Sequence, residues 1–222
     1  MGLPVVAVVD YGVGNLFSVA QALRRFDLNV EITGDWRAVQ AADAVVLPGV
    51  GAFGPAMQRL RELELDSVIR DVAAMGKPLM GICLGLQLLG RQSSEFGHHE
   101  GLGIIDGSVV QLPRVEQQGR VLKLPNIGWQ PVLPAPGNEQ AWGKTLLCDV
   151  PQGTTMYFVH TFALQVNDPD VCVAVSGYGD HEFCAAVASG SVFACQFHPE
   201  RSGETGLRMY GSFAKEINEY CK

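Results

Sequence analysis

The chain has 222 residues, of which 47% are hydrophobic and 18% charged, and its net charge is −7 at pH 7. This composition is typical of a folded globular protein and excludes a disordered chain. The acidic balance argues against binding to nucleic acid or to an anionic membrane surface, because both partners require an excess of lysine and arginine. The sequence contains neither a stretch of roughly 20 apolar residues nor a basic, apolar leader, so we expect a cytoplasmic protein.

The first half of the chain alternates short apolar runs with stretches whose apolar residues recur at helical spacing. Strands are predicted at residues 4–9, 30–33, 43–47 and 77–82, and helices at residues 14–26, 55–63, 66–75 and 84–91. Alternation of strands and helices at these lengths indicates βαβ units, and consecutive units of this kind build a parallel sheet.

The second half has strand candidates at closer spacing, followed by one terminal helix. Strands are predicted at residues 109–112, 121–124, 155–160, 170–176, 183–188 and 191–197, and a helix at residues 202–220. The proline-rich residues 131–137 are expected to form a surface loop. We therefore predict a single α/β domain over residues 1–222, in which helices flank a mixed, mostly parallel central sheet with an antiparallel extension.

A glycine-rich turn joins the first predicted strand to the first helix, with the sequence Asp10-Tyr11-Gly12-Val13-Gly14-Asn15-Leu16-Phe17. Dinucleotide-binding folds carry glycines at this place, but Phe17 replaces their third glycine, which must be small for the helix to pack on the strand. The six cysteines form no Cys-x-x-Cys pair and are expected to be free thiols. The sequence therefore predicts neither a cofactor nor a metal site.

The segment Gly81-Ile82-Cys83-Leu84-Gly85 ends an apolar strand and opens a helix. It has the Gly-x-nucleophile-x-Gly pattern of a nucleophile elbow, with cysteine as the nucleophile. Such a turn strains the backbone of the nucleophile, and side chains in place of the glycines would clash with the adjoining strand and helix. Unpaired N–H groups at the helix N-terminus favour a thiolate, and the N–H of Leu84 is well placed to bind an oxyanion. The alternative is a buried cysteine in an ordinary β-turn-α junction.

A histidine and a carboxylate follow the last predicted strand, in the segment Gln196-Phe197-His198-Pro199-Glu200. Pro199 favours an extended conformation for His198, and residues i and i+2 of an extended chain point to the same side. His198 and Glu200 can therefore face one cavity, where the carboxylate would fix the imidazole tautomer and stabilise the imidazolium. His160 also ends a predicted strand and is the competing base, but Phe162 and not an acid lies two residues further on.

Taken together, these segments resemble the class I glutamine amidotransferases and, within that class, the glutaminase subunits of imidazole glycerol phosphate synthase. The elbow and the His-Pro-Glu segment are shared by the whole class. The resemblance to the subgroup rests on three further stretches: Asp10-Tyr11-Gly12-Val13-Gly14-Asn15-Leu16, Leu47-Pro48-Gly49-Val50-Gly51-Ala52-Phe53 and Tyr157-Phe158-Val159-His160-Thr161-Phe162. It extends from residue 8 to the final helix and covers essentially the whole chain.

The resemblance implies that Cys83, His198 and Glu200 form a catalytic triad that hydrolyses the side-chain amide of glutamine. It also implies that Pro48-Gly49-Val50-Gly51 is an oxyanion strand, whose Val50 N–H is the second oxyanion donor beside Leu84. A carboxylate at Glu95 would suit the α-ammonium group of the substrate. The positions that match residues holding the glutamine are Gly51, Gln87, Glu95, Thr161 and Phe162.

The resemblance further implies a partner, a (β/α)₈-barrel cyclase that forms a heterodimer with this chain. Ammonia would cross the interface and react with a phosphorylated ribulosyl aminoimidazole carboxamide nucleotide, which yields imidazole glycerol phosphate for histidine biosynthesis. The residues at interface positions are Asn15, Trp129, Tyr157 and Arg201. Ordinary core packing is the alternative for the two aromatic residues.

The chain departs from the pattern of the subgroup at two positions. Where relatives have Pro-His-Met/Ile-Gly-Trp-Asn, this chain has Asn126 for the histidine and Gln130 for the final asparagine. These departures are the only support for an alternative hypothesis, a glutaminase that serves a different acceptor synthase. Two other hypotheses are a cysteine hydrolase or peptidase of related fold and a non-catalytic protein that serves only to bind a partner.

Overall fold

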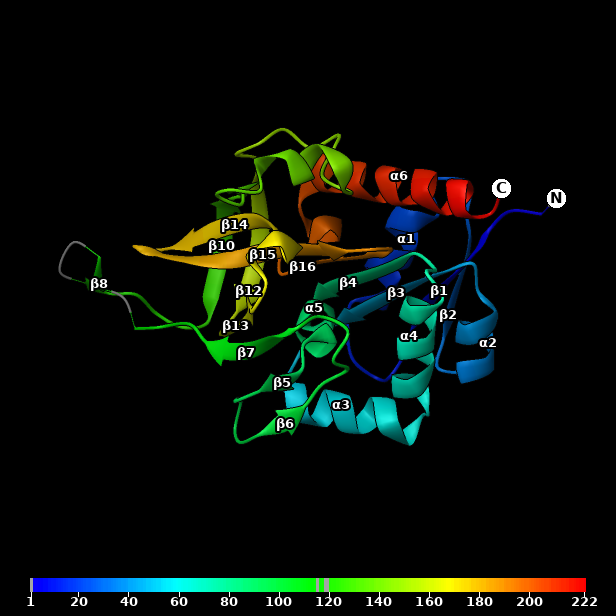
Figure 1. Cartoon of the computed structure of the whole chain (residues 1–222), viewed down its shortest axis with the longest axis horizontal. Helices are drawn as coiled ribbons and strands as arrows, with labels where there is room; N and C mark the ends of the chain where they lie inside the picture. The colour runs from blue at the N-terminus through cyan, green and yellow to red at the C-terminus, as the bar shows by residue number, and fades with distance from the viewer. Residues whose placement is uncertain (1, 115, 118–119) are drawn as a thin grey trace.

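An eight-stranded sheet is the centre of the computed structural model, which describes residues 2–114, 116–117 and 120–222 (Figure 1). The strand order is β11-β14-β15-β16-β4-β3-β1-β2. The parallel part consists of β1 (Val5–Val9), β2 (Asn29–Thr33), β3 (Ala44–Gly49) and β4 (Leu79–Cys83), joined by helices. The connecting helices are α1 (Leu16–Leu23), α2 (Trp36–Ala41), α3 (Phe53–Glu62) and α4 (Leu65–Ala74).

Helices cover both faces of this sheet, and the side chains of β1 show why. Val6 and Val8 pack into one core with α1 and with α6 (Gly203–Tyr220), whereas Ala7 and Val9 pack into a second core with α2, α3 and α4. Successive residues of a strand point to opposite faces, so a strand covered on both faces must be apolar at every position. In Figure 1, α1 and α6 lie above the sheet, and α3 and α4 lie below it.

The antiparallel extension begins at β16 (Val192–Cys195), which pairs with β4 in parallel and with β15 (His181–Ser189) in an antiparallel arrangement. β14 (Cys172–Tyr178) and β11 (Leu133–Pro134) continue the sheet beyond β15. The predicted fold class is confirmed, because parallel strands with helical connections are followed by antiparallel strands in the same sheet. This order brings β4 and β16, which are distant in the sequence, side by side.

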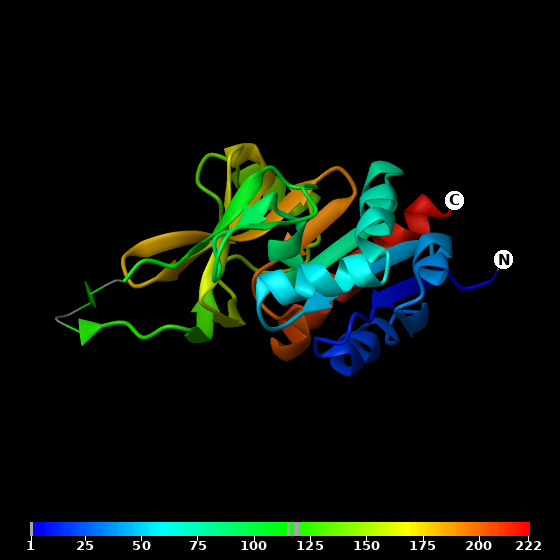
Figure 2. The ribbon, with the colours of Figure 1, turned by 90° about the horizontal axis from the view of Figure 1, so that it is seen from below.

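Three smaller sheets and several short helices complete the described part of the chain. β10 (Asn126–Pro131) pairs with β12 (Thr155–His160), and β13 (Phe162–Val166) pairs with β7 (Gly107–Gln111), which is followed by β5 (Gln92–Ser93) and β6 (His99–Glu100). The β-hairpin β8–β9 (Glu116–Gln117, Arg120–Val121) extends away from the central sheet in both ribbon views (Figure 2). The remaining helices are α5 (Leu84–Leu89) and the 3₁₀ helices η1 (Glu139–Lys144), η2 (Pro169–Val171) and η3 (Pro199–Arg201).

The sequence predictions were wrong at two places in the second half. Of the strand predicted at residues 121–124, only Val121 lies in a strand, and the stretch 131–137 is not wholly a loop because it contains β11. The prediction also missed α2, β10 and β13. These elements are short, or carry proline and glycine, so their periodicity is weak and tertiary pairing decides their conformation.

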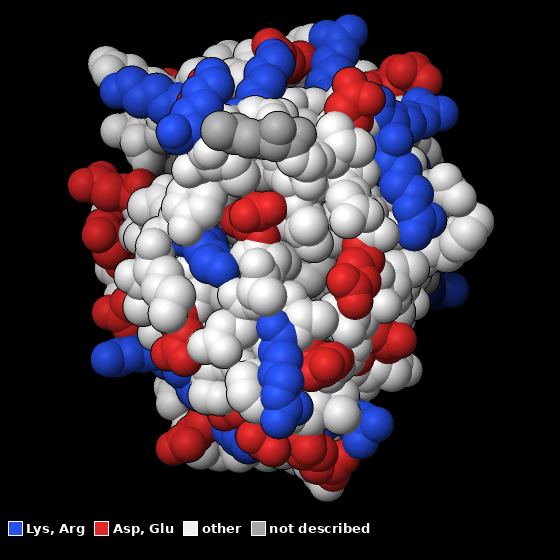
Figure 3. Space-filling model, turned by 90° about the vertical axis from the view of Figure 1, so that its right-hand side faces the viewer, with Lys and Arg blue, Asp and Glu red and all other residues white. Residues whose placement is uncertain are grey.

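Charged side chains of both signs are interspersed on the face that carries the two termini (Figure 3). Within the described part of the chain, no helix has the length and apolar character that a membrane crossing requires. The same residues include no cluster of histidine, cysteine and carboxylate side chains that could hold a metal ion.

Candidate active site

Cys83 stands at a strained turn where β4 passes into α5. Its φ of +55° and ψ of −107° lie in a region that residues with a side chain rarely adopt. The strain predicted from the sequence is therefore present. The turn places Cys83 at the N-terminal end of α5, where the N–H of Leu84 has no partner within the helix.

Both glycines of the elbow are required by close packing. A β-carbon at Gly85 would collide with the carbonyl oxygen of Leu47 on β3, and one at Gly81 would come within 2.9 Å of the β-carbon of Ala194 on β16. Both neighbouring strands approach so closely that no side chain fits, as the sequence pattern predicts. The two glycines therefore fix the position of Cys83 against β3 and β16.

The parallel pairing of β4 with β16 brings the end of one strand to the residues that follow the other. His198 lies three residues beyond the end of β16, and its Nδ1 is 2.9 Å from Oε1 of Glu200. The two side chains are 4% and 1% exposed. Nδ1–H donates to the carboxylate. The other ring nitrogen, Nε2, is buried and has no well-directed hydrogen bond among the described residues. It lies close enough to the Cys83 thiol to interact with it.

Electrostatics favour the charged form of His198. Burial acts to lower its pKa, but the closeness of the Cys83 sulfur and the hydrogen bond and charge of Glu200 outweigh burial and raise the pKa to about 10. A histidine in this setting can hold a proton between a sulfur atom and a carboxylate. The arrangement suits the transfer of a proton to a leaving group.

A cavity of about 390 Å³ opens in front of Cys83. Its walls come from the loop after β3, from α5 and from the segment between β12 and β13. All eight residues predicted as nucleophile, oxyanion donors or glutamine contacts line it: Cys83, Val50, Leu84, Gly51, Gln87, Glu95, Thr161 and Phe162. His198 and Glu200 do not line it.

Two polar side chains of the cavity are held in place by backbone groups. Oε2 of Glu95 accepts a hydrogen bond of 2.6 Å from the N–H of Phe53, the first residue of α3. The amide nitrogen of Gln87 donates to the carbonyl oxygen of Phe162 over 2.8 Å. The cavity therefore presents one fixed carboxylate and one fixed amide to a ligand.

His160 also borders the cavity, but both of its ring nitrogens are already engaged. Nδ1 lies 3.0 Å from the carbonyl oxygen of Phe162, which can only accept, so Nδ1 carries the proton and Nε2 accepts a hydrogen bond of 3.0 Å from Asn126. Burial lowers the pKa of His160 to about 4, with a smaller lowering by His198 and an opposing effect of the Phe162 carbonyl. His160 is a neutral, fully occupied imidazole, which favours His198 as the base.

Three of the four predicted interface residues form one group beside His198. The ring of Tyr157 lies 5.9 Å from that of Trp129 and 6.3 Å from that of His198, and the guanidinium of Arg201 lies over it at 4.9 Å. Trp129 is 55% exposed, so core packing does not explain it. Asn15 is exposed at the start of α1.

Sequence reasoning missed two buried residues next to Cys83. The hydroxyl of Tyr11 donates to the carbonyl oxygen of Pro48 over 2.8 Å, and burial raises the pKa of Tyr11, which keeps the hydroxyl a donor. The side-chain nitrogen of Gln196 lies 3.7 Å from the sulfur of Cys83. The sequence signal that could have found Gln196 is its place two residues before His198 in the Gln-Phe-His-Pro-Glu segment.

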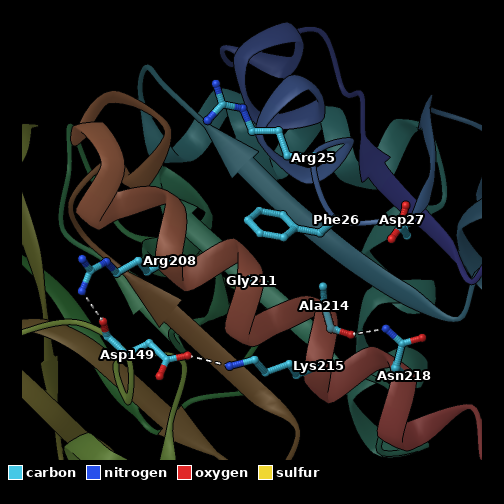
Figure 4. A pocket seen from close by; sticks show the side chains of 9 residues that line it. All are labelled: Arg25, Phe26, Asp27, Asp149, Arg208, Gly211, Ala214, Lys215 and Asn218. Carbon is cyan, nitrogen blue, oxygen red and sulfur yellow. Dashed lines mark hydrogen bonds and ion pairs between the residues drawn. The ribbon is translucent and has the colours of Figure 1, made fainter.

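A second cavity lies along α6 (Figure 4). Arg208 donates to the backbone carbonyl of Asp149 over 3.2 Å, and Nζ of Lys215 lies 2.7 Å from the carboxylate of the same residue. Phe26 projects toward α6 from the opposite wall. Because Asp149 binds both cations, and no predicted catalytic residue lines this cavity, the cavity in front of Cys83 is the better candidate for chemistry.

Comparison with known proteins identifies one family over nearly the whole chain. The model of the family "Glutamine amidotransferase class-I" matches residues 7–216. Imidazole glycerol phosphate synthase subunit HisH 1 of Legionella pneumophila (strain Lens) is 41% identical over 208 residues, which are 94% of this chain and 97% of that protein. Subunit HisH of Herpetosiphon aurantiacus is 43% identical over 210 residues, which are 95% of this chain and 93% of that protein.

Solved structures of lower identity share the fold. PurLQS from Thermotoga maritima superposes with a TM-score of 0.67 at 22% identity and covers 99% of this chain and 100% of that one. The glutaminase domain of Trypanosoma brucei CTPS has a TM-score of 0.61 at 18% identity, with coverage of 96% and 94%. At these identities the agreement concerns the arrangement of strands and helices alone.

Proposed function

This chain belongs to the class-I glutamine amidotransferases, and from that premise we propose that Cys83, His198 and Glu200 are its catalytic triad. The enzyme hydrolyses glutamine and serves histidine biosynthesis, as its identity of 41–43% to HisH subunits indicates. The assignment of the triad rests on one observation. A cysteine with a strained backbone borders a cavity and lies next to a buried histidine–carboxylate pair.

In the first half of the reaction, the sulfur of Cys83 attacks the side-chain amide carbon of glutamine. The developing oxyanion accepts hydrogen bonds from the N–H groups of Val50 and Leu84, which stabilise negative charge at the place where it forms. His198 gives its proton to the amide nitrogen, the carbon–nitrogen bond breaks, and ammonia leaves. The product is a γ-glutamyl thioester of Cys83.

In the second half, water attacks the thioester and His198 takes its proton. The carbon–sulfur bond breaks, and its electron pair returns to the sulfur of Cys83 as glutamate is released. Glu200 holds the imidazole through Nδ1 throughout, so Nε2 stays turned toward the sulfur. Gly51, Gln87, Glu95, Thr161 and Phe162 hold the amino-acid end of glutamine, for which the carboxylate of Glu95 is the counter-charge of the α-ammonium group.

The proposed partner is a (β/α)₈-barrel cyclase that takes up the ammonia in a heterodimer and makes imidazole glycerol phosphate. The relatives named HisH are subunits of that synthase, which supports a second subunit. Exposed Trp129, with Tyr157 and Arg201 beside it, offers an apolar and cationic surface next to His198. Trp, Tyr and Arg are the residues enriched at the centre of protein interfaces. Asn15 is proposed as a further contact.

We propose that residues 1–222 form one amidotransferase domain and that the protein is cytoplasmic. The family match over residues 7–216 supports one domain. A reducing compartment agrees with the cysteines, all six of which are free. The same activity toward another acceptor synthase is the second candidate, supported by Asn126 and Gln130 alone.

Glutamate release from glutamine tests the proposal. Wild-type protein should release glutamate with the cyclase and its nucleotide ligand present, and Cys83→Ala should release none while its unfolding curve stays unchanged. Ser67→Ala, an exposed residue of α4, serves as a matched control and should behave as wild type. Glutamate release by Cys83→Ala would refute the triad, and no response to the cyclase would favour a different acceptor synthase.

A further inference from the structure

A chain of two buried amides, those of Gln87 and Gln196, leads to the sulfur of Cys83. The side-chain nitrogen of Gln196 lies 3.7 Å from the sulfur, and the side-chain oxygen of Gln196 accepts a hydrogen bond of 3.0 Å from Gln87. Gln196 is fully buried and Gln87 is 6% exposed. Burying an amide without hydrogen-bond partners costs free energy, and in Gln196 both the side-chain nitrogen and the side-chain oxygen have a partner.

The direction of this chain is fixed by one backbone carbonyl. The oxygen of Phe162 can only accept, so the group of Gln87 that faces it must be the amide nitrogen, at 2.8 Å. The second proton on the same nitrogen then points at Gln196, which must present its oxygen there. The nitrogen of Gln196 is left facing Cys83, and the reverse orientation would set two donors against each other at Gln87.

We propose, on the basis of the proposed function, that the side-chain N–H of Gln196 is a further catalytic group that donates a hydrogen bond to the sulfur of Cys83. The hydrogen bond from Gln196 acts in the second half of the reaction. When the thioester carbon–sulfur bond breaks, its electron pair moves onto the sulfur, and a donor aimed at that atom stabilises the departing thiolate. Cys83 itself lies 3.8 Å from the carbonyl oxygen of Val159, which accepts from the thiol and cannot stabilise the thiolate.

Alkylation of Cys83 by iodoacetamide over a range of pH tests the contact without glutamine or a partner. Trypsin releases residues 71–91 as one peptide, because Lys77 precedes proline, and Cys83 is its sole cysteine. Exposed Cys221 provides an internal reference in the same sample. Tyr11, Cys195, His198 and, through His198, Glu200 also act on the charge of the sulfur, and the test leaves all four unchanged.

Gln196→Met removes the donor and keeps the length of the side chain. We expect the midpoint of the Cys83 alkylation profile to rise by about one pH unit, since a hydrogen bond to a charged atom is lost. A less stabilised thiolate is also the stronger nucleophile, so alkylation should be about threefold slower at low pH and about threefold faster on the high-pH plateau. Two profiles that cross are not expected from a loosened structure, which would raise reactivity at every pH.

Gln196→Glu separates the contact with the sulfur from the contact with Gln87. Wherever the glutamate is ionised, it still accepts from Gln87 but faces the sulfur with an oxygen atom that cannot donate, so at those pH values Cys83 should be alkylated as a thiol at least as weakly acidic as in Gln196→Met. Unchanged Cys83 profiles in both variants, with Cys221 also unchanged, would overturn the proposal. If the wild-type protein released no glutamate while the alkylation profile of Cys83 still changed in the Gln196 variants, the proposed function would be wrong. In that case the hydrogen bond from Gln196 to the sulfur would still be supported.

Discussion

Replacing Asn126 by aspartate tests the network that keeps His160 neutral. In the wild type, the Asn126 side chain donates to Nε2 of His160 over 3.0 Å and also accepts from Gln130 over 2.6 Å. The aspartate has the same shape and still accepts from Gln130, but it cannot donate to Nε2. A carboxylate at this place requires a proton on Nε2, so the substitution should convert His160 from a neutral to a charged imidazole at neutral pH.

The size of the effect follows from the wild-type pKa of His160. Burial lowers this pKa from 6.5 to about 4, a difference of 2.5 units. At 1.36 kcal/mol per unit, the wild type loses about 3 kcal/mol of stability as the pH falls from above 6.5 through 4, of which about 2 kcal/mol is lost by pH 5. The sign follows from linkage, because below pH 6.5 the unfolded chain binds a proton that folded His160 does not. In the variant, whose folded pKa is raised above 6.5, protonation of His160 should stabilise the protein fully below pH 6.5, and this stability should be lost as the pH rises through the raised pKa.

Two measurements check this prediction. The ¹³C-edited NMR signal of His160 should not titrate above pH 5 in the wild type and should titrate above pH 6.5 in Asn126→Asp. Urea unfolding at pH 7.5 and pH 5 should show the stability of the variant rising relative to the wild type as the pH falls. A wild-type His160 that titrates near pH 6.5 would refute the assigned tautomer and the network drawn from it.

Three further substitutions follow from the packing and hydrogen bonds of the site. Gly85→Ala should destabilise the protein by about 3 kcal/mol in urea unfolding, because its methyl group meets a backbone carbonyl. Gly143→Ala, whose methyl group would have no atom of the described residues within 4 Å, should change stability by less than about 0.5 kcal/mol. Tyr11→Phe should cost about 1 to 2 kcal/mol and lower kcat, since the carbonyl of Pro48 in the proposed oxyanion strand loses its donor, while Tyr178→Phe removes a hydroxyl that has no partner among the described residues and should be near neutral. Glu95→Gln should raise KM for glutamine about tenfold in the glutamate-release assay and leave kcat nearly unchanged, because a charge on the substrate loses its partner.

Each of these predictions has an outcome that contradicts it. Equal losses in the two glycine variants would mean that the elbow is not closely packed. Equal losses in the two tyrosine variants would mean that the hydroxyl of Tyr11 has no role beyond filling space. An unchanged KM in Glu95→Gln would remove Glu95 from the glutamine-binding residues.

The parallel half of the fold was predictable because its signals are local and repeated. β1, β3 and β4 are continuous apolar runs, and the helices α3 and α4 each carry a regular apolar face. β10 and β11 lack such a signal. Gly128 and Pro131 disfavour a strand in isolation, and pairing with β12 and β14 supplies the backbone partners that the local sequence does not indicate. The second half was therefore less predictable than the first.

The candidate active site also has one part that the sequence predicts and one part that it does not. Cys83 with its glycines and His198 with Glu200 are close in the sequence, so local spacing indicated both the elbow and the histidine–carboxylate pair. The cavity walls are different, because Glu95 and Thr161 meet only when the loops after β5 and β12 come together around α5. Without the family resemblance, no local pattern would have placed these two residues in one cavity.

The two departures from the pattern of relatives, Asn126 and Gln130, compensate for each other inside the protein. Their side chains exchange two hydrogen bonds, and Asn126 passes a third to His160. Asn126 is 4% exposed and Gln130 partly buried, whereas Ile127 and Trp129, which alternate with them along β10, are 59% and 55% exposed. Alternate residues of a strand face opposite sides, so the departures lie on the inner face and the outer face keeps the tryptophan proposed for the interface. A change of acceptor synthase would require different contacts on the outer face, so these two positions are better explained as an internal support for His160 than as the mark of a new partner.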